Sequence, residues 1–259
     1  MKKEDNIDLK ERGFTILRNV VSGEWLGKLS NSMEKSFENH RIAQVDKGIN
    51  PSTTALHALL DDDVYIEFLQ YLKDSGFIKE LQENFFNSNC IINSFSALDN
   101  LKDNPNFSSM VHRDLRFYSG DFPIMINCLV MIDEFTADNG GTYLLSESHL
   151  SPERPTDEHF FKNAVQATGK AGDILIFNSN LWHASAPNNT SDHRRGIPIT
   201  ISKSFMKQLL DYPRAIGYER IDDFSHEIQQ LLGYHSRVPA SIDEWYQPEE
   251  NRYYKKDQD

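Results

Sequence analysis

The spacing of apolar residues changes near residue 90. Before that point apolar side chains recur at the period of an amphipathic helix, and after it they form short β-branched runs bounded by polar residues. Residues 13–21 alternate and predict a strand. Ser22 then has the side chain of a helix N-cap. The helix that follows carries one apolar face, made by Trp25, Leu26, Leu29, Met33 and Phe37.

Two more helices are predicted before residue 90. An acidic triplet at 61–63 suits a helix N-terminus, where the helix dipole stabilises negative charge. The apolar positions of that helix are Val64, Tyr65, Phe68, Leu69 and Leu72. Gly76 ends it, and a third helix follows at roughly 77–87. Residues 42–56 have no clear period and are expected to form a loop.

Five short strands are expected in the second part of the chain, at 90–98, 123–132, 142–145, 173–177 and 197–202. Short strands preceded by helices predict a mainly β protein with flanking helices, in which the helices pack against one sheet of a β-sandwich or jelly roll. The strand pairing of a jelly roll brings together residues that are distant in sequence, so one site can draw its side chains from several strands.

The chain has 259 residues, enough for one large domain with a sizeable core. We expect a single domain over 1–259. Its parts would be N-terminal helical elements at about 22–88, a jelly-roll core at about 90–205, and a C-terminal helix with a polar tail over 206–259. The tail is expected to fray from about Tyr246.

Charge and composition limit the classes of partner that this protein is expected to bind. With 27 basic and 39 acidic side chains the formal charge is −12, and an acidic surface disfavours nucleic acid. The N-terminus leads into no apolar stretch of a secretion signal, and no apolar run reaches membrane-spanning length. Cys90 and Cys128 lie in apolar runs and are expected to be buried thiols. These features predict a cytoplasmic protein without a membrane partner.

His112 and Asp114 form an H-x-D pair. Side chains at i and i+2 of an extended segment point to the same side, so an imidazole and a carboxylate could approach one metal ion. In a chain with nine histidines, about one such pair is expected by chance, and taken alone the pair is better explained as a surface histidine beside an acid. His183 strengthens the metal hypothesis, because it follows Trp182 and a run at 172–178 that is typical of a buried strand.

Two histidines and one carboxylate are the ligands of the facial triad that holds non-haem Fe(II) and leaves coordination positions open. For His183 the alternative is a core histidine that bonds a backbone carbonyl. Rival third ligands are His149, His159 and His193. His193 stands beside two arginines, whose charge disfavours a metal ion. His159 lies in a charged stretch, and His149 belongs to an expected turn after a strand.

Arg194 lies eleven residues after His183 and is followed by Arg195. A guanidinium presents a planar pair of donors that matches a carboxylate, so one of these arginines could anchor a dicarboxylate co-substrate. Side chains alternate along a strand, and therefore only one of the two can face inward. The alternative is that both are solvated at the end of a loop.

Several segments in the same order resemble the phytanoyl-CoA dioxygenase family. The family's distal-histidine block is similar to Gly172-Asp173, Phe177, Trp182-His183-x-Ser185-x-Pro187-Asn188 and Arg194. Its Asn-Gly turn and Pro-Gly-Ser-His segment resemble Asp138-Asn139-Gly140-Gly141-Thr142 and Ser146-Glu147-Ser148-His149. Here Ser146-Glu147 stands in place of Pro-Gly. The opening at 13–33 is also similar, and the resemblance covers most of 13–205.

The resemblance implies a double-stranded β-helix (a cupin-like jelly roll) and a dioxygenase that depends on Fe(II), 2-oxoglutarate and O₂. The implied site residues are His112, Asp114 and His183 for the metal, with Arg194, Ser185 and Asn127 for 2-oxoglutarate. The spacing of the family favours Arg194 over Arg195. Halogenating members lack the carboxylate ligand. Because Asp114 is present, hydroxylation of a small organic molecule is expected, with release of succinate and CO₂.

Two other functions remain open at this point. A non-catalytic jelly roll that binds a ligand would take up no metal. A metal-dependent hydrolase or isomerase with the same His/Asp set would act without O₂ or 2-oxoglutarate. The arginine block argues against both. Arg113 and Arg116 lie beside the metal pair, and one of them is a candidate contact for an acidic group on the substrate. The loops at 42–57, 99–110 and 150–163 are expected to shape the pocket.

Overall fold

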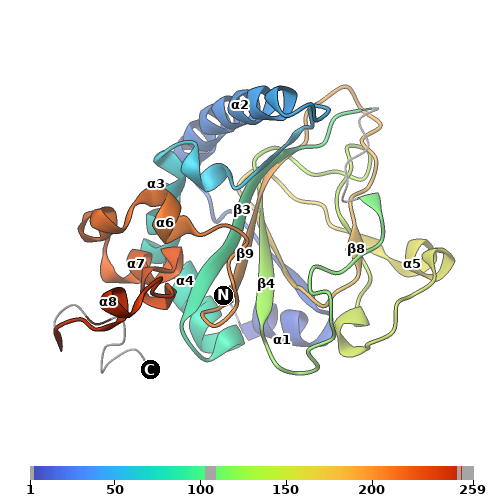
Figure 1. The fold of residues 1–259 in the computed structure, drawn as a ribbon. Helices are drawn as coiled ribbons and strands as arrows, with labels where there is room; N and C mark the ends of the chain where they lie inside the picture. Colours follow the sequence, from blue (N-terminus) through green and yellow to red (C-terminus); the bar gives the residue numbers. More distant parts are fainter. Residues whose placement is uncertain (1–2, 103–108, 250–251, 253–259) are drawn as a thin grey trace.

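The computed structural model describes residues 3–102, 109–249 and 252, and it has two antiparallel sheets (Figure 1). The six strands of the larger sheet are, in spatial order, β1 (Phe14–Leu17), β7 (Ile174–Asn178), β4 (Met125–Met131), β9 (Arg195–Lys203), β3 (Cys90–Asp99) and β2 (Thr54–Leu56). The smaller sheet has the order β6 (Val165–Gln166), β5 (Tyr143–Leu144) and β8 (His183–Ala184). Sequence-adjacent strands are mostly not neighbours, as expected for a jelly roll.

Helices cover one face of the larger sheet. Figure 1 shows most of them on one side of β3, β9 and β4, with β8 on the other side. The α-helices are α1 (Lys3–Glu11), α2 (Gly23–Asp46), α3 (Val64–Asp74), α4 (Phe77–Leu81), α5 (Asp157–Asn163), α6 (Tyr212–Ile216), α7 (His226–Leu232) and α8 (Ile242–Trp245). A π-helical turn, Gln82–Phe86, extends α4, and 3₁₀ turns lie at Ala58–Leu60, Ser148–Leu150, Tyr218–Asp223 and Tyr234–Ser236.

The alternation along β4 separates the core from the site. Ile126 and Val130 belong to the apolar cluster that β3, β7 and β9 form with α2, α3, α4 and α7. Leu129 and Met131 point the other way and pack in a second cluster between the two sheets. Asn127 has the same parity as Leu129, so the pleat directs it toward the interior of the jelly roll.

The predicted fold class, mainly β with flanking helices in a jelly-roll arrangement, is confirmed. Ser22 is the N-cap of α2 and accepts a hydrogen bond from the Trp25 amide at 3.4 Å. The predicted second helix is α3, and Gly76 follows its end with φ +81°. The five predicted strands correspond to β3, β4, β5, β7 and β9.

The expectation of a loop over 42–56 was wrong at both ends. α2 continues to Asp46 because no glycine or proline interrupts the segment before Gly48, and helix propagation needs no buried face there. Ile42 and Val45 are accordingly exposed. Thr54–Leu56 forms β2, a three-residue edge strand whose order depends on pairing with β3. Pairing between distant segments leaves no period in a run this short.

Two further boundaries differ from the prediction. Residues 150–163 contain α5, whose N-cap Thr156 accepts from the His159 amide at 3.2 Å. That capping signal was present in the sequence, ahead of acidic Asp157 and Glu158. In the described residues after 205, three short α-helices stand where one helix was expected before the polar tail. Most of the tail expected to fray lies outside the described residues.

The structure tests two expectations from the sequence, one about the cysteines and one about membrane-spanning helices. Cys90 and Cys128 are buried free thiols, as predicted, and burial raises the pKa of Cys90 to about 12. Within the described ranges, the helices lack the combined length and apolar character that crossing a bilayer requires.

Candidate metal centre

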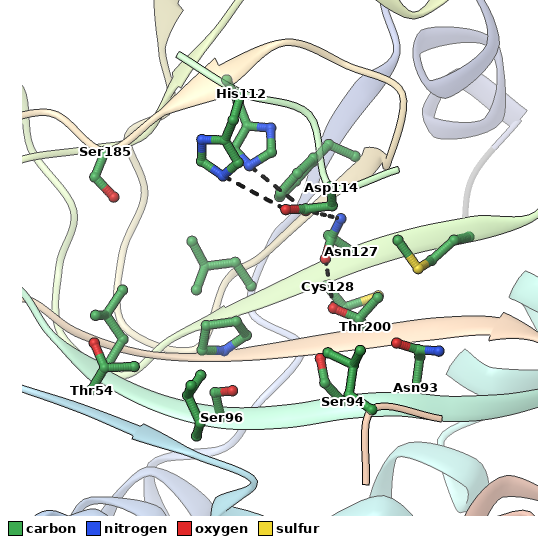
Figure 2. Close-up of a pocket in the computed structure, with 18 of the residues that line it drawn as sticks. Thr54, Asn93, Ser94, Ser96, His112, Asp114, Asn127, Cys128, Ser185 and Thr200 are labelled. Carbon is green, nitrogen blue, oxygen red and sulfur yellow. Dashed lines mark hydrogen bonds and ion pairs between the residues drawn. The ribbon is translucent and has the colours of Figure 1, made fainter. Parts of the chain in front are cut away.

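His112, Asp114 and His183 come together at the opening between the two sheets. One potential ligand atom from each residue lies within 4.8 Å of the others. The distance from His112 Nε2 to Asp114 Oδ1 is 3.6 Å, and that from His183 Nε2 to Asp114 Oδ2 is 3.7 Å (Figure 2). A divalent ion with bonds of about 2 Å fits such a triangle. The donor set, two imidazoles and a carboxylate on one side, suits a transition metal.

Backbone pairing brings the two histidines together. His112 and His183 exchange backbone hydrogen bonds of 3.0 and 2.8 Å as an isolated antiparallel bridge, which extends β8. Their ring centroids are therefore 4.2 Å apart. The sequence expectation placed His183 at the end of the strand now called β7. In the structure a short turn carries it into the smaller sheet.

The same kind of contact orients both rings. His112 Nδ1 lies 2.7 Å from the carbonyl oxygen of Met110, and His183 Nδ1 lies 2.9 Å from that of Leu181. A carbonyl oxygen can only accept, so each Nδ1 carries the proton and donates. Each Nε2 then presents its lone pair to the centre, which is the tautomer that a metal ligand needs.

Burial favours the neutral form of the second histidine. Desolvation lowers the pKa of His183, and His112 adds to this effect, whereas the Asp114 carboxylate opposes it. His183 is 6% exposed, so a charge on this ring would be poorly solvated. A neutral imidazole is also the form that coordinates a metal.

The Asp114 carboxylate is held by a chain of polar side chains that crosses β4 and β9. Asn127 donates from Nδ2 to Asp114 Oδ2 at 2.7 Å and to Ser179 Oγ at 2.8 Å. Thr200 donates from Oγ1 to Asn127 Oδ1 at 2.8 Å, and the two residues are direct partners in the β4–β9 ladder. Both ends of the Asn127 amide are thus engaged. Sequence reasoning missed Ser179 and Thr200. The signal for Thr200 was a polar side chain inside the largely apolar strand β9, whereas Ser179 lies in the turn after β7 and gave no such signal.

Arg194 is a buried cation without a hydrogen-bond partner among the described residues. It is 0% exposed, and none of its guanidinium nitrogens makes a hydrogen bond to the described part of the chain. Burial lowers the pKa of Arg194 to about 10, although Asp99 and Asp133 oppose this effect. Its guanidinium stacks over the Phe135 ring, 4.6 Å from the ring centroid. An unpaired buried guanidinium is costly, and a carboxylate ligand would satisfy it.

Arg195 has different surroundings. It makes a bidentate pair with Asp133, at 2.9 Å from Nε to Oδ2 and 2.9 Å from Nη2 to Oδ1, and also donates to Ser30 on α2. The hydrogen bond to Asp133 raises the pKa of Arg195. Of the two candidate anchors, Arg194 lines the cavity and Arg195 ties β9 to the helical layer.

A cavity of about 840 Å³ lies next to the cluster. Its lining includes His112, Asp114, His183, Arg194, Ser185 and Asn127, the six residues singled out from the sequence. Residues of the segment 42–57 also line it. In contrast, no residue of 150–163, a segment that the structure describes in full, is part of the lining. The expectation that 150–163 shapes this pocket was wrong. Of the remaining segment, 99–110, residues 103–108 lie outside the described residues.

The rival histidines lie elsewhere. His149 Nε2 bonds the Lys10 carbonyl at 3.0 Å, and His193 pairs with Asp99 at 2.6 Å. His159 lies on α5. Within the described ranges, these histidines do not belong to a cluster that could hold a metal. Arg113 stacks over Trp182 at 5.2 Å, whereas Arg116 lines the cavity.

A family model described as phytanoyl-CoA dioxygenase (PhyH) matches residues 9–196. The chain belongs to the PhyH family. The resemblance read from the sequence is thereby confirmed. An uncharacterized protein of Mycobacterium tuberculosis is 36% identical over 152 residues, which are 59% of this chain and 56% of that protein. This PhyH-family chain therefore spans little more than half the length of that relative.

Other relatives carry dioxygenase names. The dioxygenase sphC of Aspergillus fumigatus is 24% identical over 255 residues, covering 89% of this chain and 67% of that protein. Among solved structures, the non-heme alpha-ketoglutarate-dependent carbocyclase SnoK from nogalamycin biosynthesis has a TM-score of 0.62 and 13% identity, covering 79% of this chain and 85% of that one. At this identity the likeness concerns the fold. Together these matches support an oxygenase.

Proposed function

We propose that this PhyH-family protein is a dioxygenase dependent on Fe(II) and 2-oxoglutarate, which hydroxylates a small organic molecule and releases succinate and CO₂. The observation that carries the proposal is Arg194, a buried guanidinium without a hydrogen-bond partner among the described residues, on the wall of the cavity that contains the His–Asp–His cluster. A metal site alone fits many reactions. A metal site that shares its cavity with a buried guanidinium fits a dicarboxylic acid that chelates the metal at one end and pairs with the arginine at the other.

Different residues of the site would bind the metal ion and the co-substrate. His112, Asp114 and His183 would hold Fe(II) from one side. Arg194 would bind the distal carboxylate of 2-oxoglutarate, and Ser185 would add a hydroxyl contact to the same molecule. When bound, iron and 2-oxoglutarate would supply the oxidising power: as 2-oxoglutarate lost CO₂, one atom of O₂ would be incorporated into succinate and the other would be inserted into a C–H bond of the substrate.

The protein contributes orientation. The carbonyls of Met110 and Leu181 fix the two imidazoles, and Asn127 fixes the carboxylate. Each ligand side chain is thus oriented by another protein group, an arrangement that preorganises a metal site. Asp114 supports hydroxylation over halogenation, because its carboxylate occupies the position that halogenating relatives leave for chloride. The expectation of a cytoplasmic protein acting on a small molecule stays a prediction.

The test is an anaerobic titration of the purified protein with Fe(II) and 2-oxoglutarate. The chelate is expected to give a weak visible charge-transfer band, and admission of O₂ is expected to yield succinate. Asp114→Ala should abolish the band, and Lys28→Ala, on an exposed part of α2, should leave it unchanged. Metal uptake without a band or succinate would favour a hydrolase or isomerase. No metal uptake would favour a non-catalytic binding protein.

A further inference from the structure

The cavity wall that faces the His–Asp–His cluster is lined by small hydroxyl side chains. Ser94 and Ser96 are two residues apart on β3, and Thr54 lies on the neighbouring edge strand β2 (Figure 2). The pleat places Ser94 and Ser96 on the inner face of the larger sheet. Phe95, between them, points the other way into the helix-covered core. The serines therefore belong to the lining of the cavity and not to the helix-covered core.

These hydroxyls have unused hydrogen-bonding capacity. In the part of the chain that the structure describes, the side-chain hydroxyls of Ser94, Ser96 and Thr54 make no hydrogen bond to another protein group; the contacts of Thr54 with Ser52 involve its backbone. Thr200, the ladder partner of Ser94, differs because its hydroxyl is bonded to Asn127. Ser96 is 7% exposed, so what it faces is the cavity.

Other parts of the same cavity carry large apolar side chains, although Arg116 and Lys207 also belong to its lining. Leu115 and Met125 pack together with Met206 in a separate apolar cluster of the lining. At the rim, Leu56, Phe117 and Leu209 are 58%, 49% and 70% exposed. Exposed large apolar side chains gathered around one opening are typical of a ligand-binding surface. Asp114 is the carboxylate among the described lining residues, so the walls hold no second acid that would attract a cationic molecule.

We infer that the substrate is a compact molecule of drug-like size with two unlike faces, one apolar and one bearing hydroxyl or carbonyl oxygens. The oxygen-bearing face lies against Ser94, Ser96 and Thr54, and the apolar face lies against Leu115 and Met125. The inference rests on the proposed function for the reaction. It excludes an unbranched acyl chain as the group that fills the cavity.

Physical cost decides against the acyl chain. A hydrocarbon chain packed against the serine wall would displace water from three hydroxyls and leave them without partners. A ligand with oxygens on that face would satisfy the same groups. Sites built to hydrogen-bond a ligand reject the analogue that lacks the matching group much more strongly than sites that recognise apolar shape. The cavity of about 840 Å³ has room for such a molecule beside 2-oxoglutarate.

The experiment uses two steroids with the same ring skeleton. Hydrocortisone bears three hydroxyls that progesterone lacks, and decanoyl-CoA serves as the unbranched chain. Binding is measured by equilibrium dialysis on the full chain as purified. We expect tighter binding of hydrocortisone than of progesterone and the weakest binding of decanoyl-CoA. In Ser94→Ala/Ser96→Ala the affinity for hydrocortisone should fall about tenfold or more, and that for progesterone less than about twofold.

Ser191→Ala, on an exposed turn, is the matched control and should bind all three probes as the wild type does. The single variants Ser94→Ala and Ser96→Ala replace the double variant if its thermal unfolding shows misfolding. Preference for progesterone or decanoyl-CoA, absence of binding by either steroid, or equal losses for both steroids would overturn the inference. A hydrocortisone preference without a charge-transfer band would sink the proposed function alone.

Discussion

Arg194 and Arg195 are consecutive in the chain, yet their guanidinium groups lie on opposite sides of the start of β9. The Arg194 side chain lines the cavity, fully buried and without a hydrogen-bond partner in the described residues. The Arg195 side chain is paired with Asp133 and reaches Ser30 on α2. Because successive side chains along a strand point to opposite faces, two neighbouring arginines have different surroundings and are expected to have different roles.

Replacement of Arg194 should separate stability from co-substrate binding. Arg194→Met removes a buried, unpaired cation, so the ligand-free protein should gain about 1 kcal/mol or more in its free energy of unfolding. The same change should raise the KM for 2-oxoglutarate about 100-fold, since the distal carboxylate loses its charged partner. Urea denaturation and succinate formation measure the two effects. A loss of stability with an unchanged KM would contradict this assignment.

Arg195→Met is the matched control for that pair of measurements. It leaves Asp133 without its bidentate partner, so the free energy of unfolding should fall by about 1 kcal/mol, a modest value because both side chains are 23% exposed. The KM for 2-oxoglutarate should change less than about twofold, because the side chain faces the helical layer. If Arg195→Met raised the KM as much as Arg194→Met, the two arginines would have to share the anchor.

Asn127 is expected to act on the metal through Asp114. Asn127→Ala removes the 2.7 Å hydrogen bond that holds the carboxylate, and Mn²⁺ affinity, measured by electron paramagnetic resonance, should fall about 10- to 100-fold. Thr200→Val, one bond further away, should cause a smaller loss in the same direction. A rise in the KM for 2-oxoglutarate with unchanged Mn²⁺ affinity would instead support the direct co-substrate contact that the sequence suggested for Asn127.

Gly140 belongs to the Asn-Gly turn that the sequence singled out. Its φ is +95°, and an added Cβ would lie 2.3 Å from Asn100 Nδ2 and 2.6 Å from the Ala186 carbonyl, next to Ser185. Gly140→Ala should therefore lower the free energy of unfolding by about 2–4 kcal/mol. Gly120→Ala, at φ +59° with no heavy atom within 4 Å, should cost about 1 kcal/mol. If denaturant titrations gave equal losses in the free energy of unfolding for the two variants, the close approach of Asn100 to Gly140 would make no contribution.

His149 is expected to make stability depend on pH. Burial lowers its pKa, while the Lys10 carbonyl and Glu147 oppose this; Nε2 donates to Lys10, and the buried Nδ1 has no partner in the described residues. A histidine with a lowered native pKa binds its proton more readily in the unfolded state. Its contribution is therefore fully present above the unfolded pKa of about 6.5 and is lost as the pH falls through the lower native value.

The measurement compares wild type with His149→Gln, whose side-chain amide can still donate to Lys10. Between pH 7 and 5 the free energy of unfolding of the wild type should fall more steeply, by up to about 1.4 kcal/mol per pH unit for a single proton. The variant should have a shallower slope in the same range. Parallel curves for the two proteins would assign the pH dependence to other groups.

The elements that the sequence predicted correctly are long enough to show a regular spacing of apolar residues. α3 has a complete apolar face, and β4 is an almost continuous apolar run, so both were located to within a few residues. β2 and β8 have three and two residues, and neither carries a period. Their strand character arises from the pairing of β2 with β3 and of β8 with β5, with a further bridge from β8 to His112, and such pairing is a property of the folded chain. α5 differs, because its N-cap Thr156 and its acidic first turn are readable from the sequence, although the helix itself has only seven residues.

The sequence by itself determined the chemistry available to this protein: the identities of the candidate ligands, the arginine eleven residues after the second histidine, and the order of motifs that marks the PhyH family. Tertiary structure decided which of these groups meet. It separated Arg194 from Arg195, bonded Asn127 to Asp114, and turned three hydroxyls toward one cavity. The physical reason is that residue types are local information, whereas distances across a jelly roll depend on strand register, which is set by the packing of the whole sheet.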